Sequence, residues 1–228
     1  MPSTAFVLNG QVGLPSARQL LAASGKLFTV TNPTLGTGVA WATLATQSAT
    51  ANGLFVVSNN APPGGPNIFL DRLKLKQTAT APTATLSLNF EAFNETGIVA
   101  GTGNVATRTP VQINTALSQT TFATVQAFSA GGVTIPAAVG TRRLQGTAEI
   151  ATGLTIIKDT FIVDFGQDGP SAPIPGLTGA RSVVNARMTT QMDPIIIAPQ
   201  TTTWLNMWWD ATASNVPSFE YCLSYFEL

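Results

Sequence analysis

Strict alternation of apolar and polar side chains identifies one strand in the middle of the chain. In the segment Ala84–Phe93, five apolar residues occupy every second position, and the residues between them are Thr, Ser, Asn and Glu. Successive side chains of a β-strand point to opposite faces, so this pattern predicts a strand with one buried and one polar face. Glycine and proline, 20 and 15 residues respectively, separate further short runs rich in β-branched residues. This punctuation is typical of many short strands joined by turns.

The same signals predict strands along most of the chain. We expect them at Leu27–Asn32, Gly38–Gln47, Gly53–Ser58, Asn67–Gln77, Leu144–Ala151, Thr155–Phe165, Val183–Thr190, Ile195–Ile197, Thr202–Asp210 and Ser218–Leu228. The short connection Thr152–Leu154 contains a glycine and predicts a hairpin between Leu144–Ala151 and Thr155–Phe165. Gly97–Arg108 is polar and glycine-rich and predicts a loop, as does the proline-containing Gln167–Gly179. Pro110–Thr134 fits neither the helical nor the strand period.

One helix is expected before the strands begin. The segment Pro15–Ser24 opens with a proline and a serine, which favour a helix start, and Gly25 favours its end. Residues 1–25 are therefore interpreted as an N-terminal arm or cap, and residues 26–228 as a single domain. With about eight to ten strands and little helix, the predicted fold class is all-β, a sandwich of two antiparallel sheets.

The strand near the C-terminus is apolar on both faces. Leu205, Met207 and Trp209 alternate with Trp204 and Trp208. A strand in a two-layer sandwich buries one face in its own core, so the second face needs another cover. We expect Trp204 and Trp208 to lie at a subunit interface. Burial within the chain and a sugar-stacking platform are the alternatives.

The final strand repeats this arrangement more weakly. Phe219, Tyr221, Leu223 and Tyr225 share one face, and Cys222, Phe226 and Leu228 point towards the other. The predicted subunit interface therefore also includes Phe226 and Leu228.

Charge content adds a reason to expect association. Of the 228 residues, 11 are basic and 11 acidic, so charged side chains make up 10% of the chain and the net charge is +0. Ordinary domains contain about 25% charged residues, and proteins near zero charge tend to associate. The only dense basic clusters are Arg72, Lys74 and Lys76 and the pair Arg142 and Arg143. We therefore expect no direct nucleic-acid partner. No apolar run is long enough to predict a membrane span, so we expect no membrane partner either.

The residue types needed for most catalysis are missing. The sequence has no histidine, the commonest general base and zinc ligand, and its one cysteine, Cys222, excludes an intrachain disulfide. A glycosidase could use two carboxylates, and the candidates are Glu91, Glu149, Asp159, Asp164 and Asp168. Binding loop amides or an arginine is the simpler role for them. Asp164, Gln167 and Asp168 lack the acidic series of a calcium-binding EF-hand loop. We expect no enzyme activity, no cofactor and no metal.

Several segments together resemble tailed-phage virion proteins of jelly-roll type. They are Phe28–Pro33, Leu54–Ser58, Asn67–Leu75, Pro194–Pro199, Trp204–Trp209 and Phe219–Glu227. The resemblance implies a capsid decoration, cement or minor capsid protein without catalytic residues. It also implies a homotrimer that binds a lattice of the major capsid protein, in a virion assembled in the host cytoplasm.

A carbohydrate- or receptor-binding module of a virion is the alternative function. Trp204, Trp208 or Tyr221 would then stack on sugar rings. Asn206 and Asp210 share the alternation of the two tryptophans and would supply hydrogen bonds to the sugar.

Overall fold

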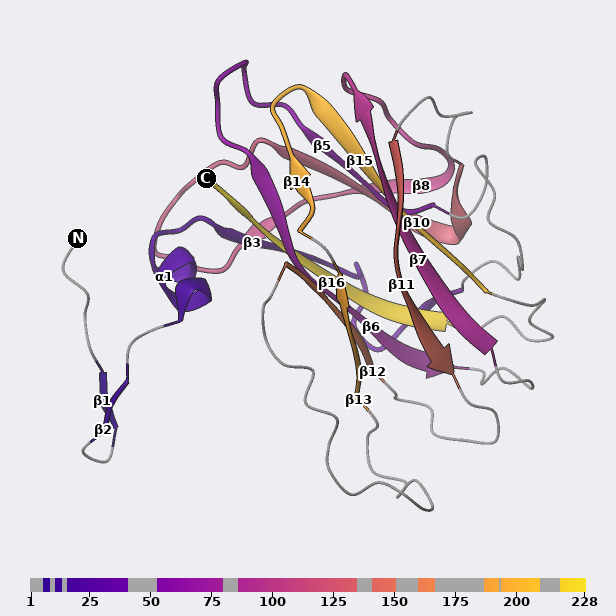
Figure 1. The fold of residues 1–228 in the computed structure, drawn as a ribbon, viewed down its shortest axis with the longest axis horizontal. Helices are drawn as coiled ribbons and strands as arrows, with labels where there is room; N and C mark the ends of the chain where they lie inside the picture. The colour runs from indigo at the N-terminus through magenta and orange to yellow at the C-terminus, as the bar shows by residue number, and fades with distance from the viewer. Residues whose placement is uncertain are drawn as a thin grey trace.

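Two sheets packed against each other form the body of the protein (Figure 1), and the described strand pairs are antiparallel except for the parallel pair of residues 160–165 with 187–192. The computed structural model describes residues 6–8, 11–13, 16–40, 53–79, 86–134, 141–150, 160–166, 187–192, 194–209 and 218–228. The six-stranded sheet has the order β11 (Thr141–Ile150), β7 (Leu86–Thr96), β15 (Thr201–Trp209), β5 (Gly53–Asn59), β10 (Ala123–Thr134), β8 (Thr102–Arg108). The eight-stranded sheet has the order β13 (Arg187–Met192), β12 (Thr160–Phe165), β6 (Ile68–Ala79), β16 (Ser218–Glu227), β3 (Leu27–Thr31), β9 (Val111–Gln112); β14 (Ile196–Ile197) pairs with β6 and β4 (Val39–Ala40) with β16. The predicted all-β sandwich is confirmed.

The strands pair in a nested order, from the two ends of the domain inwards. β3 pairs with β16, β5 with β15, β6 with β12 and β7 with β11, and all four pairs are antiparallel. β16 also pairs with β6, and β15 with β7, which joins the pairs into two sheets. A long hairpin folded over in this way is a jelly roll, as the sequence predicts. β8 and β10 extend the six-stranded sheet beyond β5.

The core lies between the sheets and is rich in aromatic rings. Along β16, alternate residues are buried: Phe219, Tyr221, Leu223 and Tyr225. Tyr221 meets Phe55 of β5 edge to face, with the ring centroids 5.1 Å apart. β6 alternates in the same way, with Leu73 buried and Lys74 exposed. The two-residue period therefore decides which side chains enter the core and which stay on the outer face.

The strand β15 is buried on both faces within its own chain. Leu205 lies opposite Phe55 and Ala92, and Trp204 lies opposite Val56 and Phe93 on the other face. The rings of Trp204 and Phe93 stack with their centroids 5.9 Å apart, and Trp204 is 0% exposed.

Segment 97–101 helps to cover this second face. The backbone N–H of Val99 donates to Thr202 Oγ1 at 2.9 Å, and the N–H of Gly101 donates to Gln126 Oε1 at 2.8 Å. By register, Thr202 and Gln126 share the face of Trp204. A ring without exposed surface cannot contact a second subunit. The structure thus corrects the interface role expected for Trp204, because the chain itself supplies the cover.

Two predictions about connections are wrong. Gly97–Arg108, expected to be a loop, contains β8, which is the outermost strand of its sheet and mostly exposed. An exposed edge strand has little need for apolar alternation, so the sequence lacks the strand signal. Leu144–Ala151 and Thr155–Phe165 do not form a hairpin, because β11 and β12 belong to different sheets.

The segment without a clear period, Pro110–Thr134, divides into β9 and β10. The register of β10 against β5 shifts between Ala127 and Val133, which interrupts the two-residue period. The predicted strand Val183–Thr190 is observed in part as β13, and the predicted loop Gln167–Gly179 lies outside the described residues.

The predicted helix is present as α1 (Ala17–Ala23). Ser16 caps it: the N–H of Gln19 donates to Ser16 Oγ at 3.3 Å, and the N–H of Ser16 donates to Gln19 Oε1 at 2.7 Å. Arg18 pairs with the buried Asp71 of β6 at 3.0 Å and holds the helix against the eight-stranded sheet. In the part of the chain that the structure describes, no helix is long and apolar enough to cross a membrane.

The short strands β1 (Phe6–Leu8) and β2 (Gln11–Gly13) pair with each other in a separate two-stranded sheet. The division into an arm of residues 1–25 and a domain of residues 26–228 stays a prediction.

Burial of Trp204 predicts a large loss of stability on truncation. We expect Trp204→Ala to lower the free energy of unfolding by about 3–5 kcal/mol, because it removes a stacked ring from a packed site. Leu35→Ala is the control, since Leu35 is 84% exposed and should change stability by less than about 0.5 kcal/mol. Urea unfolding measures both, and equal midpoints for the two variants would contradict the burial of Trp204.

Candidate functional site

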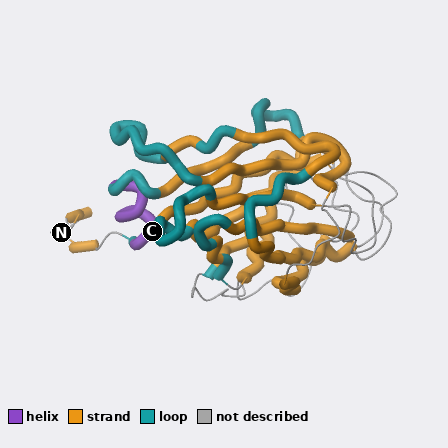
Figure 2. The backbone as a smooth tube through the Cα atoms, turned by 90° about the horizontal axis from the view of Figure 1, so that it is seen from above, coloured by secondary structure: helices purple, strands orange, loops and turns teal. Residues whose placement is uncertain are grey.

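The helix α1, several loops and the C-terminal residue lie at one end of the sandwich (Figure 2), and exposed large apolar side chains occur in segments of this kind. Among the described residues, nine large apolar side chains are exposed, and eight of them belong to α1, to the connections β7–β8 and β9–β10, to the short strands β9 and β14, or to the C-terminal residue: Leu20, Ile98, Val111, Ile113, Leu117, Phe122, Ile196 and Leu228. The ninth, Leu35, lies in the turn between β3 and β4. We call the eight side chains the end surface. An exposed apolar patch is typical of an interaction site, and these eight side chains are the candidates for one.

Hydrogen bonds of the buried Asn59 join the connection after β5 to segment 194–200, which carries Ile196 of the end surface. Its Nδ2 donates to the carbonyls of Pro66 and Ile197 at 2.9 and 3.0 Å, and its Oδ1 accepts from the N–H of Ala61 at 3.0 Å. The backbone carbonyl of Asn59 accepts from Gln200 N–H at 2.8 Å. Segment 194–200, with Ile196, is therefore held in place by hydrogen bonds to Asn59.

The C-terminus is fixed in the same way. Leu228 exchanges two backbone hydrogen bonds with Asn67, at 2.8 and 3.0 Å. Glu227 Oε1 accepts from the N–H of Phe122 at 2.9 Å and from the hydroxyl of Thr121. Thr121 also bonds the hydroxyl of Tyr225 at 2.8 Å, and burial raises the pKa of Tyr225 far above its ordinary value. Leu228 is thus held in place while its side chain stays 50% exposed.

The four residues predicted to form a subunit interface do not lie together on one exposed face. Trp204 is buried, as described above. Phe226 is half-buried and stacks on Phe69, with ring centroids 5.1 Å apart. Leu228 belongs to the end surface. The side chain of Trp208 lies outside the described residues, so its role stays a prediction, as do those of Phe226 and Leu228.

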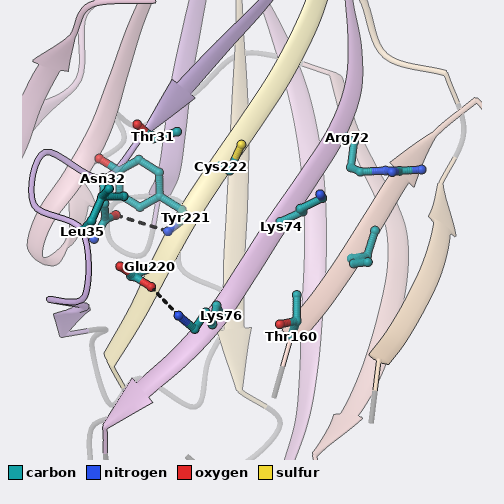
Figure 3. Close-up of a pocket in the computed structure, with 11 residues that line it drawn as sticks. Thr31, Asn32, Leu35, Arg72, Lys74, Lys76, Thr160, Glu220, Tyr221 and Cys222 are labelled. Atoms are coloured by element: carbon teal, nitrogen blue, oxygen red, sulfur yellow. Dashed lines mark hydrogen bonds and ion pairs between the residues drawn. The ribbon is translucent and has the colours of Figure 1, made fainter. Parts of the chain in front are cut away.

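A groove of about 430 Å³ lies on the outer face of the eight-stranded sheet (Figure 3). Its lining comes from β3, β6, β12, β16 and the turn after β3 and consists of Thr31, Asn32, Leu35, Arg72, Lys74, Lys76, Thr160, Ile162, Glu220, Tyr221 and Cys222. Arg72, Lys74 and Lys76 stand at every second position of β6 and so share this face. The sequence marks them as a dense basic cluster, but their common groove depends on the neighbouring strands.

Ion pairs neutralise two of the three cations. Arg72 Nε pairs with Asp164 of β12, and Lys76 Nζ pairs with Glu220 Oε2 of β16 at 3.0 Å. For Lys74, the described part of the chain provides no ion-pair partner.

Glu220 also fixes the turn that forms one wall of the groove. The N–H of Gly36 donates to Glu220 Oε1, and this bond, together with Lys76, holds the pKa of Glu220 below its ordinary value of 4.5. On the same turn, Asn32 Nδ2 donates to the carbonyl of Thr37 at 2.8 Å. Leu35 is thereby held out into solvent beside the groove.

The two glycosidase candidates whose side chains the structure describes, Glu91 and Asp164, are not brought together. Glu91 lies on β7 and Asp164 on β12, in different sheets, and Asp164 binds Arg72 as the simpler interpretation expects. The side chain of Glu149 and the whole of Asp159 and Asp168 lie outside the described residues.

Three of the five residues of the sugar-binding alternative are buried, and two of the residues compared with a calcium-binding loop lie outside the described part of the chain. Gln167 and Asp168 of the weak calcium pattern are not described, and among the described residues no group of three or more His, Cys, Asp or Glu side chains could hold a metal ion. Trp204 and Tyr221 are buried and cannot stack on a sugar. Asn206 is likewise buried, and Asp210 lies outside the described residues.

Comparisons with protein-family models, with curated proteins and with solved structures find no match to this chain.

Replacing Asn59 tests the hydrogen bonds that hold segment 194–200 in place. We expect Asn59→Ala to cost about 2–4 kcal/mol of unfolding free energy, because it leaves buried backbone groups without partners. Asn60→Ala is the matched control: Asn60 also bonds Phe122 and Thr124, but it is exposed, and water can replace its bonds at a cost of about 0.5 kcal/mol. Thermal unfolding of the two variants measures the difference, and equal losses would contradict a central role for Asn59.

The bond between Glu220 and the N–H of Gly36 predicts that the turn after β3 becomes less stable in acid. Because its pKa is lowered in the folded state, its carboxylate stabilises the fold above its ordinary pKa of 4.5, and this contribution disappears as the pH falls through the lowered value. We expect the urea midpoint of Glu220→Gln to fall less than that of the wild type between about pH 5 and pH 3. Parallel pH curves for the two proteins would show that Glu220 makes no such contribution.

Proposed function

We propose that the protein is a non-enzymatic structural subunit of a tailed-phage virion, which decorates or cements the capsid through self-association and contacts with the capsid lattice. The observation that carries the proposal is the end surface. Its eight apolar side chains are exposed, and backbone hydrogen bonds already hold several of the segments that carry them, so a partner can bury these side chains without refolding those segments.

The low charge of the chain supports the same proposal. With 10% charged residues and a net charge of +0, copies of the protein meet no long-range repulsion. Burial of apolar area then supplies the free energy of association. A ring of identical subunits, with a trimer as the expected size, would cover the end surface of every copy.

The jelly-roll topology is compatible with this role, but it does not distinguish a virion protein from other jelly-roll proteins. Jelly rolls occur in capsid proteins, lectins and cupins, so the role has to be argued from the surface. Against a lectin, two of the proposed stacking rings are buried, as described above. The virion context comes from the resemblance of the strand segments to tailed-phage proteins.

Charged substitutions on the end surface should dissociate the oligomer. We expect the wild type to sediment as an oligomer at micromolar concentration, and Val111→Asp combined with Phe122→Asp to sediment as a monomer, because each aspartate would be desolvated in the interface. Leu35→Asp is the control with the most exposed of the large apolar side chains, and it should keep the oligomer. A monomeric wild type, or a double variant that still associates, would contradict the end surface as an interface.

Purified particles test the virion role separately. We expect a mass-spectrometric inventory of virions from the source of this chain to contain the protein at a fixed ratio to the major capsid protein. Its absence from intact particles would remove the capsid part of the proposal and leave self-association to be judged from sedimentation alone.

A further inference from the structure

The floor of the groove on the eight-stranded sheet places one lysine between two uncharged neighbours. In the register of the sheet, Lys74 of β6 lies opposite Cys222 of β16 on one side and Ile162 of β12 on the other. The next outward positions along β6 are the paired cations Arg72 and Lys76. Lys74 is therefore the central group of the floor, as the close-up shows (Figure 3).

The ion pairs among the described residues leave one positive charge of the groove without a partner. Arg72 is matched by Asp164 and Lys76 by Glu220, whereas the ammonium of Lys74 has no ion-pair partner among the described residues. The net charge of the chain is +0, so this local excess is not part of a general basic surface. A ligand with a single negative charge would balance the groove.

The uncharged part of the lining indicates what else the ligand carries. Ile162 on the floor and Leu35 on the wall are apolar, and the hydroxyls of Thr31 and Thr160 can donate hydrogen bonds. The volume of about 430 Å³ is in the range of small-molecule sites.

We propose that this groove binds a carboxylate attached to a short aliphatic group, with Lys74 as the residue that binds the charge. The carboxylate can belong to a free organic acid or to an acidic side chain of a polypeptide, since both present the same group. A phosphate dianion fits less well, because the other two cations already have partners. This site is separate from the end surface and does not depend on the proposed structural role.

Cys222 provides a direct reporter of occupancy. It is the one cysteine of the chain, it lines the groove beside Lys74, and its thiol is half-buried and bonded to Thr29 Oγ1 at 3.2 Å. The rate at which the neutral reagent iodoacetamide alkylates Cys222 is measured on the full chain while hexanoate is added. Hexanamide, the uncharged isostere, is titrated in parallel, and heat of binding is recorded by calorimetry as a second readout.

We expect hexanoate to slow alkylation with saturation, and hexanamide at the same concentration to have little effect. Lys74→Gln should weaken hexanoate binding by about twofold to fivefold, the range of an exposed charge pair, and Lys74→Arg should restore most of it. Lys26→Gln is the matched control, since Lys26 lies outside the groove lining, and should bind as the wild type does.

A second arm distinguishes the two sources of the carboxylate. An acetylated and amidated peptide Leu-Glu-Leu and its glutamine counterpart are titrated in the same two assays. Tighter binding of the glutamate peptide than of hexanoate would assign the groove to an acidic segment of a polypeptide, and the reverse order to a free acid. The proposal is overturned if neither carboxylate saturates, or if Lys74→Gln binds either of them as tightly as the wild type.

Discussion

Contact between the aromatic side chains of β16 and the six-stranded sheet holds the two layers of the sandwich together. Tyr221 meets Phe55 and Phe128, with ring-centroid distances of 5.1 and 5.6 Å. Its buried hydroxyl accepts from Arg108 Nε at 2.8 Å, so the additional strand β8 is tied to the opposite sheet. Burial raises the pKa of Tyr221, and the nearby Arg108 opposes this shift in part. β16 makes these contacts from the middle of its sheet, where it pairs with β3 on one side and β6 on the other.

Both candidate surfaces follow from this arrangement. Alternation along β16 turns Tyr221 inwards and Cys222 outwards, and the same period on β6 places Lys74 beside Cys222 in the groove. At the end of the sandwich, the loops that enter and leave the sheets are joined through Asn59 and Leu228. The groove therefore takes its shape from sheet register, whereas the end surface takes its shape from loop contacts. The two surfaces can serve different partners.

The sequence anticipated these surfaces only in part. Leu228 was expected to face a partner and is exposed, and Arg72, Lys74 and Lys76 were visible as a cluster. Asn59 was not identified, because a buried asparagine differs from a loop asparagine only in the partners that distant segments bring to it. The alternation along β15 correctly predicted two apolar faces, but it could not show that segment 97–101 helps to cover one of them.

The sequence by itself determined the all-β class, most strand positions, the capped helix and the low charge, because these depend on local periodicity, turn residues and composition. Tertiary structure alone decided which strands pair, that β11 and β12 lie in different sheets, and that Trp204 is covered by its own chain. It also decided that two cations of β6 are neutralised by ion pairs, whereas Lys74 has no ion-pair partner among the described residues. The physical reason is the same in each case. Strand pairing, burial and ion pairs join residues that are far apart in the chain, and a local sequence pattern does not determine which distant residues meet.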